Sequence, residues 1–323
     1  MTMADLAVLA GVSKITVSRA LGEGGLVNPE TRAHIRALAE QHGYTLNVNA
    51  RNLRLRRSHT VAVVVEMTPS PSRPISGPYP MEILGGISHE LTSVGYSVLL
   101  TTRQAPMTPA LQAADGLILL GQGAHDEAVH VLDRWQLPMV VWGARRAQDR
   151  HIFVGSDNRE GGARAAERFV SIGRRHPAFL GNVDHMEIAA RAAGFGEALA
   201  VHGIKHTLLR REAFTMAAGA EAMQTLLADR KAPRIDALFA CNDLLAMGAI
   251  RALTERGLRV PEDVSVIGYD DTPLGANFIP PLTSVHQGWH EGGILLARKV
   301  LALIDGKRAR SEMLPTSLVV RAT

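Results

Sequence analysis

Side chains between Lys14 and Arg19 have the types and the spacing needed to read base edges in a DNA groove. Residues three and four apart are neighbours on a helix surface, so one face would carry Lys14, Ile15, Ser18 and Arg19. Arginine forks onto guanine, lysine reaches a guanine edge or a phosphate, and isoleucine packs on a thymine methyl. Hydroxyls suit phosphate oxygens, so the candidate DNA-binding residues here are Ser13, Lys14, Ile15, Thr16, Ser18 and Arg19. The alternative is an ordinary helical hairpin whose outer face is simply solvated.

Two short helices joined by a tight turn must hold that face. Thr2, with Asp5 three residues later, has the form of a capping box and begins the first helix. The apolar face of this helix carries Met3, Leu6, Ala7 and Ala10. Gly11 ends the helix, and Ser13 is a good N-cap for the second one. The spacing therefore predicts a helix-turn-helix.

The same residues carry a family pattern. AxxAGVSxxTVSRAL, followed by VxPxTRxxIxxLAxxxGY, fits within Met3 to Tyr44 and resembles the DNA-binding head of the lactose and purine repressor family, the LacI type. Asn28 and Pro29 supply the cap and the first residue of a third helix, which Gly43 closes. We therefore expect a DNA-binding head over residues 1–45.

Residues 46–58 are either a linker or a hinge helix. Four arginines fall between Arg51 and Arg57, and they repel one another until phosphates neutralise them. The resemblance implies a hinge helix that becomes ordered on operator DNA, with Leu53 as a wedge in the minor groove. It also implies DNA contacts from the NxxARxL pattern, which is Asn47, Ala50, Arg51 and Leu53. Leu46 stands where the family usually has proline, so the start of this helix is less fixed.

Composition places the chain in a broad class. With 323 residues, 46% of them hydrophobic and 20% charged, it has more than one domain's worth of core. No apolar run reaches the ~18 residues of a membrane span, no signal segment is apparent, and the single Cys241 excludes an internal disulfide, so we expect a cytoplasmic protein. Residues 1–60 hold eight Lys and Arg against four Asp and Glu, whereas residues 61–323 hold 27 of each. A basic head on a neutral body is typical of a nucleic-acid binder with a second function elsewhere.

Beyond the head, short apolar runs alternate with amphipathic helical patterns. Strands are predicted at Val61–Glu66, Tyr96–Thr102, Gly116–Leu120, Met139–Trp142, Ala178–Leu180, Ala237–Ala240 and Val264–Tyr269. Helices are predicted at Met81–Val94, Asp126–Trp135, Gly162–Ile172, Ile188–His202, Thr215–Ala228 and Asp243–Arg256. This α/β alternation predicts two subdomains with doubly wound parallel sheets.

Motifs in this region resemble the sugar-binding core of the same family and of periplasmic sugar-binding proteins. They are SDNxxGG from Ser156, RxxGF from Arg191, the run from Cys241 to Leu253, VPEDVSVIGYDD from Val260 and PPLTSVxQ from Pro280. The resemblance implies two lobes joined by three crossings, placed near Asn158, Gln287 and Ser311. A ligand-binding and dimerisation core over 59–323 would then have one lobe of about 59–157 and 288–310 and another of about 158–287 and 311–323. Only 13 residues separate Thr102 from Gly116, so we expect a shortened first lobe there.

Polar residues gather after the predicted strands, where such folds bind ligands. Each has an ordinary alternative, because Asn242 is a helix cap, Asp270 belongs to a turn and Arg191 is a solvated helix face in the plainest interpretation. Their combination resembles the ligand contacts of the family, in which Arg and Asp grip hydroxyls and amides fix orientation. The candidate ligand-binding residues in the second lobe and at the crossings are Asn158, Arg191, Phe214, Asn242, Asp270 and Gln287.

The first lobe departs from the family pattern. The segment 68–80 has five prolines, so Tyr79 is its only candidate ring. Gly143 stands where pentose binders have an aspartate, and Trp142 and Arg103 are further candidates for the same cleft. These departures leave the identity of the sugar open.

Enzymatic functions have little support. No HExxH, CxxC, GxSxG, GxxxxGK[ST] or GxGxxG occurs, so no metal site or cofactor is expected. Asp270 and Asp271 as paired carboxylates are disfavoured, because adjacent residues on an extended segment point apart.

We therefore predict a transcriptional repressor that binds a palindromic operator as a homodimer and responds to a small carbohydrate. A purine-type regulator with a corepressor is the alternative. A solute-binding protein would need a signal peptide and no DNA-binding head. The sequence ends at Ala322 and Thr323 without a heptad repeat, so we do not expect the coiled coil that would form a tetramer.

Overall fold

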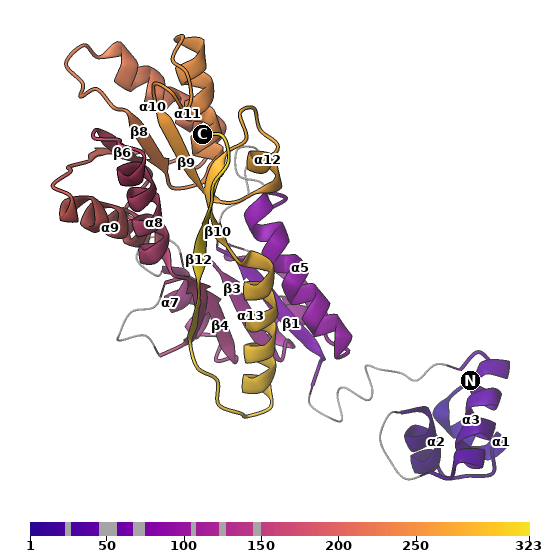
Figure 1. The fold of residues 1–323 in the computed structure, drawn as a ribbon. Coiled ribbons are helices and arrows are strands. Elements are labelled where there is room, and N and C mark those ends of the chain that lie inside the picture. The colour runs from indigo at the N-terminus through magenta and orange to yellow at the C-terminus, as the bar shows by residue number, and fades with distance from the viewer. Residues whose placement is uncertain (23–26, 45–56, 67–74, 105–107, 123–126, 145–149) are drawn as a thin grey trace. The chain divides into compact units, whose positions relative to one another are not determined.

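A computed structural model describes residues 1–22, 27–44, 57–66, 75–104, 108–122, 127–144 and 150–323 (Figure 1). The chain divides into a small unit, Met1–Ser58, and a large unit, His59–Thr323. The sequence analysis predicted a head over 1–45, a linker or hinge over 46–58 and a core over 59–323. In the described residues, no helix is long and apolar enough to cross a membrane.

The small unit contains the predicted helix-turn-helix and third helix. They are α1 (Met3–Leu9), α2 (Lys14–Leu21) and α3 (Pro29–Gln41). Thr2 and Asp5 form the expected capping box, and the Ser13 hydroxyl accepts from Thr16 N at 3.1 Å. Gly11 turns between the first two helices at φ 63°, a conformation that favours glycine. A small core holds the three helices together, made of Leu6, Ala7, Val17, Ala20, Ile35 and Ala39.

The large unit contains two six-stranded sheets. The first has the order β11 (Glu312–Leu314), β5 (Ile152–Ser156), β4 (Met139–Trp142), β3 (Gly116–Leu120), β1 (Thr60–Val65) and β2 (Ser97–Thr102). The second has the order β12 (Thr316–Val319), β10 (Thr283–Gln287), β9 (Ser265–Asp270), β8 (Ala237–Ala240), β6 (Pro177–Leu180) and β7 (Thr207–Leu209). Among the pairs seen, only β10 with β12 is antiparallel, so the predicted parallel α/β class is confirmed.

Helices cover both faces of the first sheet. Val61, Val63 and Val65 of β1 pack toward α5 (Pro78–Ser93) and α13 (Trp289–Ile304). Ala62 and Val64 face α6 (Pro109–Gln112) and α7 (Glu127–Asp133). This burial on both faces explains why β1 is a continuous apolar run. The four-residue α6 fits the expected shortening between Thr102 and Gly116.

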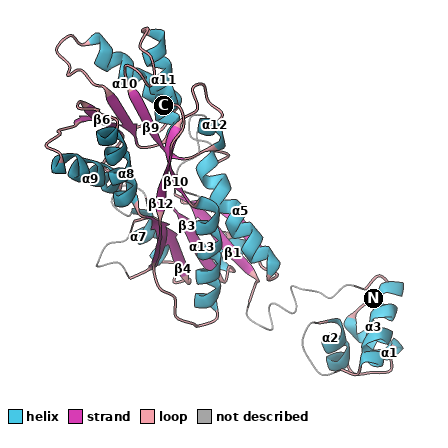
Figure 2. Ribbon diagram, viewed as in Figure 1, coloured by secondary structure: helices cyan, strands magenta, loops and turns pink. Residues whose placement is uncertain are grey.

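Two helix pairs flank the second sheet (Figure 2). They are α8 (Asn158–Ser171) with α9 (Met186–Val201) and α10 (Met216–Ala228) with α11 (Asp243–Glu255), while α12 (Pro273–Ala276) is a short turn of helix. These two pairs, like α5 with α13, approach so closely that a glycine on each helix meets the backbone of the other. A Cβ would collide there at Gly86 and Gly293, Gly162 and Gly194, and Gly219 and Gly248.

Three crossings join the two sheets. Two lie where they were predicted, between β5 and α8 at Asn158 and between β10 and α13 after Gln287. The third was predicted near Ser311 but lies at Pro315, because residues 312–314 pair with β5 and therefore extend the first lobe. The sequence analysis also missed the strands β5, β7, β10, β11 and β12 and the helices α6, α12 and α13.

Candidate functional site

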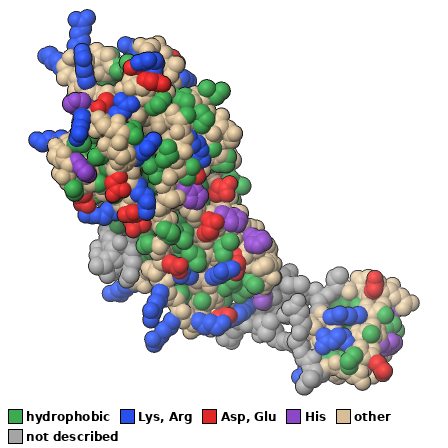
Figure 3. Space-filling view, in the orientation of Figure 1, with side chains coloured by type: hydrophobic (Ala, Val, Ile, Leu, Met, Phe, Trp, Pro, Cys, Tyr) green, Lys and Arg blue, Asp and Glu red, His purple; other side chains and the backbone are tan. Residues whose placement is uncertain are grey.

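The outer face of α2 is open in the small unit. Lys14, Ile15 and Arg19 are exposed, and Ile15 keeps 61% of its surface accessible although it is apolar. The opposite side is closed, because Val17 and Ala20 are fully buried. Figure 3 shows basic side chains together on the visible face of this unit. The helix therefore presents a basic and partly apolar face with the geometry that a major groove accepts.

The hydroxyl side chains of this face are more buried or more hydrogen-bonded than Lys14 and Arg19. Ser13 Oγ and Thr16 Oγ1 lie 2.9 Å apart in a hydrogen bond, and Thr16 and Ser18 are half-buried. The expected hinge contacts Asn47, Ala50, Arg51 and Leu53 lie outside the described residues.

The large unit has a cavity of about 250 Å³ at the carboxyl ends of strands from both sheets. Its lining includes eight of the nine predicted ligand-binding residues, namely Tyr79, Trp142, Asn158, Arg191, Phe214, Asn242, Asp270 and Gln287. Parallel strands end in such a cavity because their carboxyl ends share one edge of each sheet. Arg103 is the exception and does not line the cavity. Its guanidinium lies 3.9 Å from Glu66, which does line it.

Arg191 is the buried cation of the cavity, and it is 8% exposed. Its Nε donates to Asn158 Oδ1 at 2.8 Å, and its Nη1 donates to the Cys241 carbonyl at 2.6 Å. The guanidinium also stacks on the Tyr269 ring at 3.6 Å from the centroid. The Gly162 backbone approaches that of Arg191 too closely for any side chain, which brings α9 against the start of α8. Arg191 is therefore a fixed group and not a solvated helix face.

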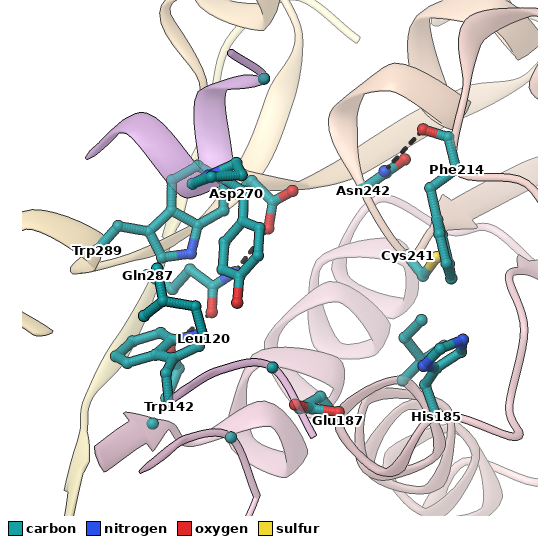
Figure 4. A pocket seen from close by; sticks show the side chains of 18 of the residues that line it. Leu120, Trp142, His185, Glu187, Phe214, Cys241, Asn242, Asp270, Gln287 and Trp289 are labelled. Carbon is teal, nitrogen blue, oxygen red and sulfur yellow. Dashed lines mark hydrogen bonds between the residues drawn. The ribbon is translucent and has the colours of Figure 1, made fainter. Parts of the chain in front are cut away.

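A hydrogen-bonded chain links the two lobes beside Arg191. Ser156 Oγ, at the end of β5, donates to Gln287 Oε1 at 2.6 Å, and Gln287 Nε2 donates to Asp270 Oδ1 at 2.6 Å (Figure 4). Burial raises the pKa of Asp270 well above its usual range, and the nearby charge of Arg191 opposes that rise. The pKa of Tyr269 is raised to about 12 by burial, so this ring remains a neutral surface under the guanidinium.

Asn242 is a helix cap, as its ordinary interpretation predicts, and it also lines the cavity. Its Oδ1 accepts from Leu245 N at 2.8 Å as the N-cap of α11, and its Nδ2 donates to the Phe214 carbonyl at 3.3 Å. Phe214 meets His185 edge to face, with 5.4 Å between ring centroids. These residues form the wall of the cavity that lies opposite Trp142 and Trp289 in Figure 4.

The first-lobe wall is aromatic. Tyr79 packs edge to face on Trp289 at 5.5 Å between centroids, and Trp142 lies below Trp289 in Figure 4. Trp289 is 6% exposed, and its Nε1 has no hydrogen-bond partner among the described residues. A buried N–H without a partner costs free energy, and Trp289 is one of the residues that line the cavity. Phe214 is the aromatic candidate of the second lobe, whereas Tyr79, Trp142 and Trp289 belong to the first.

The side chain of Gln122, which the sequence analysis missed, packs directly against Gly143. Gln122 Oε1 accepts from Ala144 N at 2.7 Å, and a Cβ on Gly143 would collide with the Gln122 side chain. Gln122 therefore occupies the space beside Gly143.

Several other lining residues were missed as well. They are Glu66, Ser156, His185, Glu187 and Trp289. The signal for Glu66 and Ser156 was available, because each stands at the end of an apolar run that becomes a strand. His185 and Glu187 lie at the start of a helix, where the sequence offers no comparable sign.

Some chemistry has no support in this cavity. Burial raises the pKa of the Cys241 thiol to about 12, so it is not a thiolate nucleophile. No group of three His, Cys, Asp or Glu side chains with the geometry of a metal site occurs in the described parts of the chain.

Comparisons with known proteins agree with both units. Residues 2–47 match the family of bacterial regulatory proteins of the lacI type, and residues 166–323 match the periplasmic binding protein-like domain. The transcriptional regulator CelR of Thermobifida fusca is 34% identical over 99% of this chain and 97% of its own length. The probable repressor ExuR of Bacillus subtilis is 32% identical over 96% of this chain and 94% of its own length.

Solved structures give the same result. A CelR–cellobiose complex is 31% identical with a TM-score of 0.71, and the alignment covers 100% of this chain and 99% of that one. A lac repressor dimer bound to operator and the anti-inducer ONPF is 26% identical with a TM-score of 0.86 over 100% and 98% of the two chains. Similarity of this strength over nearly the whole length shows that the chain belongs to the LacI family of bacterial transcriptional regulators.

Proposed function

We propose that this regulator is a repressor whose operator affinity is controlled by a small neutral carbohydrate in the cavity of the large unit. One observation carries the proposal: the same cavity is lined by a buried Arg191, by Asp270 and by aromatic side chains that include Trp289. Paired cationic and anionic hydrogen-bonding groups suit vicinal hydroxyls, and aromatic rings suit the apolar face of a sugar ring. The cellobiose bound to CelR makes this the first compound to test.

DNA recognition is assigned to the exposed face of α2. Arg19 and Lys14 would contact guanine edges or phosphates, and Ile15 would contact a thymine methyl. Ser13, Thr16 and Ser18 would bind phosphates, which for Ser13 and Thr16 would replace the hydrogen bond between their hydroxyls. Asn47, Ala50, Arg51 and Leu53 would form the minor-groove contact of the hinge, as in the family pattern.

The effector would act by a population shift. Three crossings join the lobes, and the chain from Ser156 through Gln287 to Asp270 spans them, so a ligand held by both walls favours one arrangement of the lobes. A homodimer on a palindromic operator would transmit that preference to two heads at once. We infer that the sugar relieves repression, and that the protein acts in the cytoplasm on chromosomal DNA.

Catalysis is not part of the proposal. Asp270 accepts from Gln287, whereas Asp271 Oδ1 accepts from Arg321 Nη2 at 2.6 Å, so the adjacent carboxylates serve different partners. Incubation of the protein with cellobiose and analysis of the products by chromatography should recover the sugar unchanged.

A thermal-shift screen tests the effector. Cellobiose, glucose, glucuronate and hypoxanthine are each added to the full-length protein. A ligand at a hundred times its Kd stabilises by about 2.7 kcal/mol, which raises Tm by about 5–10 °C for a unit of this size. We expect that shift with cellobiose or glucose. A shift with hypoxanthine alone would contradict the carbohydrate proposal and favour the purine-type alternative.

A further inference from the structure

We propose that Asp243 is a positioning residue that aims the Asp270 carboxylate into the effector cavity. The inference rests on the proposed function, since Asp270 needs aiming only if the cavity binds an effector. Asp243 lies in the first turn of α11 and is 1% exposed. It has no partner of opposite charge in the hydrogen bonds seen for it, which makes its burial a feature that needs an explanation.

The turn that carries Asp270 is strained. Asp270 has φ 109° and Asp271 has φ 52°, although neither residue is glycine. Two consecutive residues in this region are unfavourable and persist only where their surroundings over-determine the backbone. The turn follows β9 directly, so its shape decides where the Asp270 side chain points.

Asp243 provides the hydrogen bonds that hold the backbone of this turn. Its Oδ2 accepts from Thr272 N at 2.7 Å and from Thr272 Oγ1 at 2.8 Å. Its Oδ1 accepts from Ser284 Oγ at 2.6 Å, and Ser284 Oγ in turn accepts from Asp271 N at 3.0 Å. One carboxylate therefore fixes two successive backbone N–H groups of the turn, one directly and one through a hydroxyl.

The surroundings of Asp243 are shaped for a carboxylate. A Cβ on Gly268 would collide with Asp243 Oδ1, and a Cβ on Gly275 would lie 3.0 Å from Oδ2. Glycine at these two positions leaves room for both oxygens between β9 and α12. Because the carboxylate is acceptor-only, each of its bonds needs a donor from the turn or from β10, and the amide of an asparagine cannot replace both oxygens.

Aiming Asp270 has a direct consequence for the cavity. With the turn held, Asp270 meets Gln287 Nε2 at 2.6 Å at the crossing between the lobes. If the turn relaxed to ordinary backbone angles, the carboxylate would leave both Gln287 and the field of Arg191. Asp243 thus influences effector binding through Asp270 although its own oxygens are occupied by protein donors.

A double-mutant cycle with cellobiose as the probe tests the proposal. The full-length wild type is compared by calorimetry with Asp243→Asn, Asp270→Gly and the double variant. Glycine at 270 removes the carboxylate and tolerates the positive φ. We expect Asp243→Asn to weaken cellobiose binding at least tenfold in the wild type and less than twofold in the Asp270→Gly background. Equal effects in both backgrounds would overturn the proposal, because a purely structural role does not depend on the Asp270 carboxylate.

A matched control and a ligand-free measurement complete the design. Asp236 accepts from Arg175 N and His176 N at 2.8 Å each, outside the cavity, so Asp236→Asn removes comparable bonds and should leave cellobiose affinity unchanged. Hydrogen exchange in the absence of sugar should show faster exchange at Asp271 and Thr272 in Asp243→Asn. Unchanged protection there would overturn the proposal.

Two further outcomes remain distinguishable. If cellobiose and glucose fail to bind the wild type, the carbohydrate assignment is wrong, and the exchange at Asp271 and Thr272 still decides whether Asp243 holds the turn. If Asp243→Asn does not fold, Ser284→Ala and Thr272→Val each remove one link, and each should give a smaller loss of protection in the same two amides.

Discussion

Replacing Arg191 by methionine gives a sharp test of the cavity, because methionine keeps the length of the buried stem and removes the charge. The change removes the hydrogen bonds to Asn158 and to the Cys241 carbonyl and the stacking on Tyr269. Two hydrogen bonds from a charged donor contribute about 3 kcal/mol at about 1.5 kcal/mol each. We therefore expect Tm to fall by about 6–12 °C with the fold retained.

Arg191→Met should also weaken the binding of the effector, apart from its effect on stability. Losing one charged donor costs a ligand about 1.5–3 kcal/mol, or about one to two powers of ten in affinity. The charge of Arg191 also opposes the rise in the pKa of Asp270, so its removal raises that pKa further and neutralises a second gripping group. Operator affinity without ligand should remain, because the DNA-binding residues belong to the other unit.

Calorimetry with cellobiose, fluorescence anisotropy with operator DNA and circular dichroism measure the three quantities. Arg251→Met is the control, because Arg251 is exposed on α11 and pairs with Glu255 at the surface. The reasoning would be refuted by a folded Arg191→Met protein with normal response to sugar. It would also be refuted by a folded variant that loses operator binding together with sugar binding.

The remaining predictions concern DNA, stability and the aromatic wall. Arg19→Ala should cost about 1–3 kcal/mol on the operator and relax preference at one base pair per half-site, whereas an equal loss on random DNA would make Arg19 a phosphate contact only. Leu53→Ala should reduce DNA bending, measured by gel mobility, without changing sugar affinity, and an unaltered bend would remove the wedge. Burial raises the pKa of Asp243 from 3.8 to about 6, so its proton is held more tightly in the folded state, and its contribution to stability falls as pH rises from 4 to 6. The free energy of unfolding in urea should therefore fall with pH over this range in the wild type, and Asp243→Asn should lack this pH-dependent part, which is about 3 kcal/mol at most. Identical pH profiles for the wild type and the variant would contradict the prediction. Trp289→Phe should weaken cellobiose binding by about tenfold through loss of the indole N–H, and unchanged calorimetry would show that no ligand oxygen reaches it.

The sequence predicted the parts of the fold that are determined locally. The capping box of Thr2 and the caps at Ser13 and Asn28 formed as expected, because caps depend on residues only two or three positions away. Strands β7 and β11 were missed because each has three residues, all of them half-buried or exposed, and takes its form from pairing with a distant partner. Because β11 pairs with β5, the third crossing lies at Pro315 and not near Ser311 as predicted.

In the candidate site, too, the sequence predicted features with a local signal and missed those that depend on distant parts of the chain. Arg191 and Asp270 were found because polar residues beside apolar strands are unusual, and the family pattern singled them out. Trp289 was missed because an apolar residue at the start of a helix has no local sign of facing a cavity. Arg103 is not among the residues that line the cavity, because the end of a strand fixes the position of a residue but not the direction of its side chain.

The reciprocal glycine contacts of α5 with α13, α8 with α9 and α10 with α11 have a mechanical consequence. Helices that touch backbone to backbone have no side-chain layer between them to slide or repack, so each lobe resists internal shear. Compliance is then concentrated in the three crossings, at Asn158, after Gln287 and at Pro315. We therefore expect each lobe to move as a unit, with the changes in backbone angle falling at these three crossings.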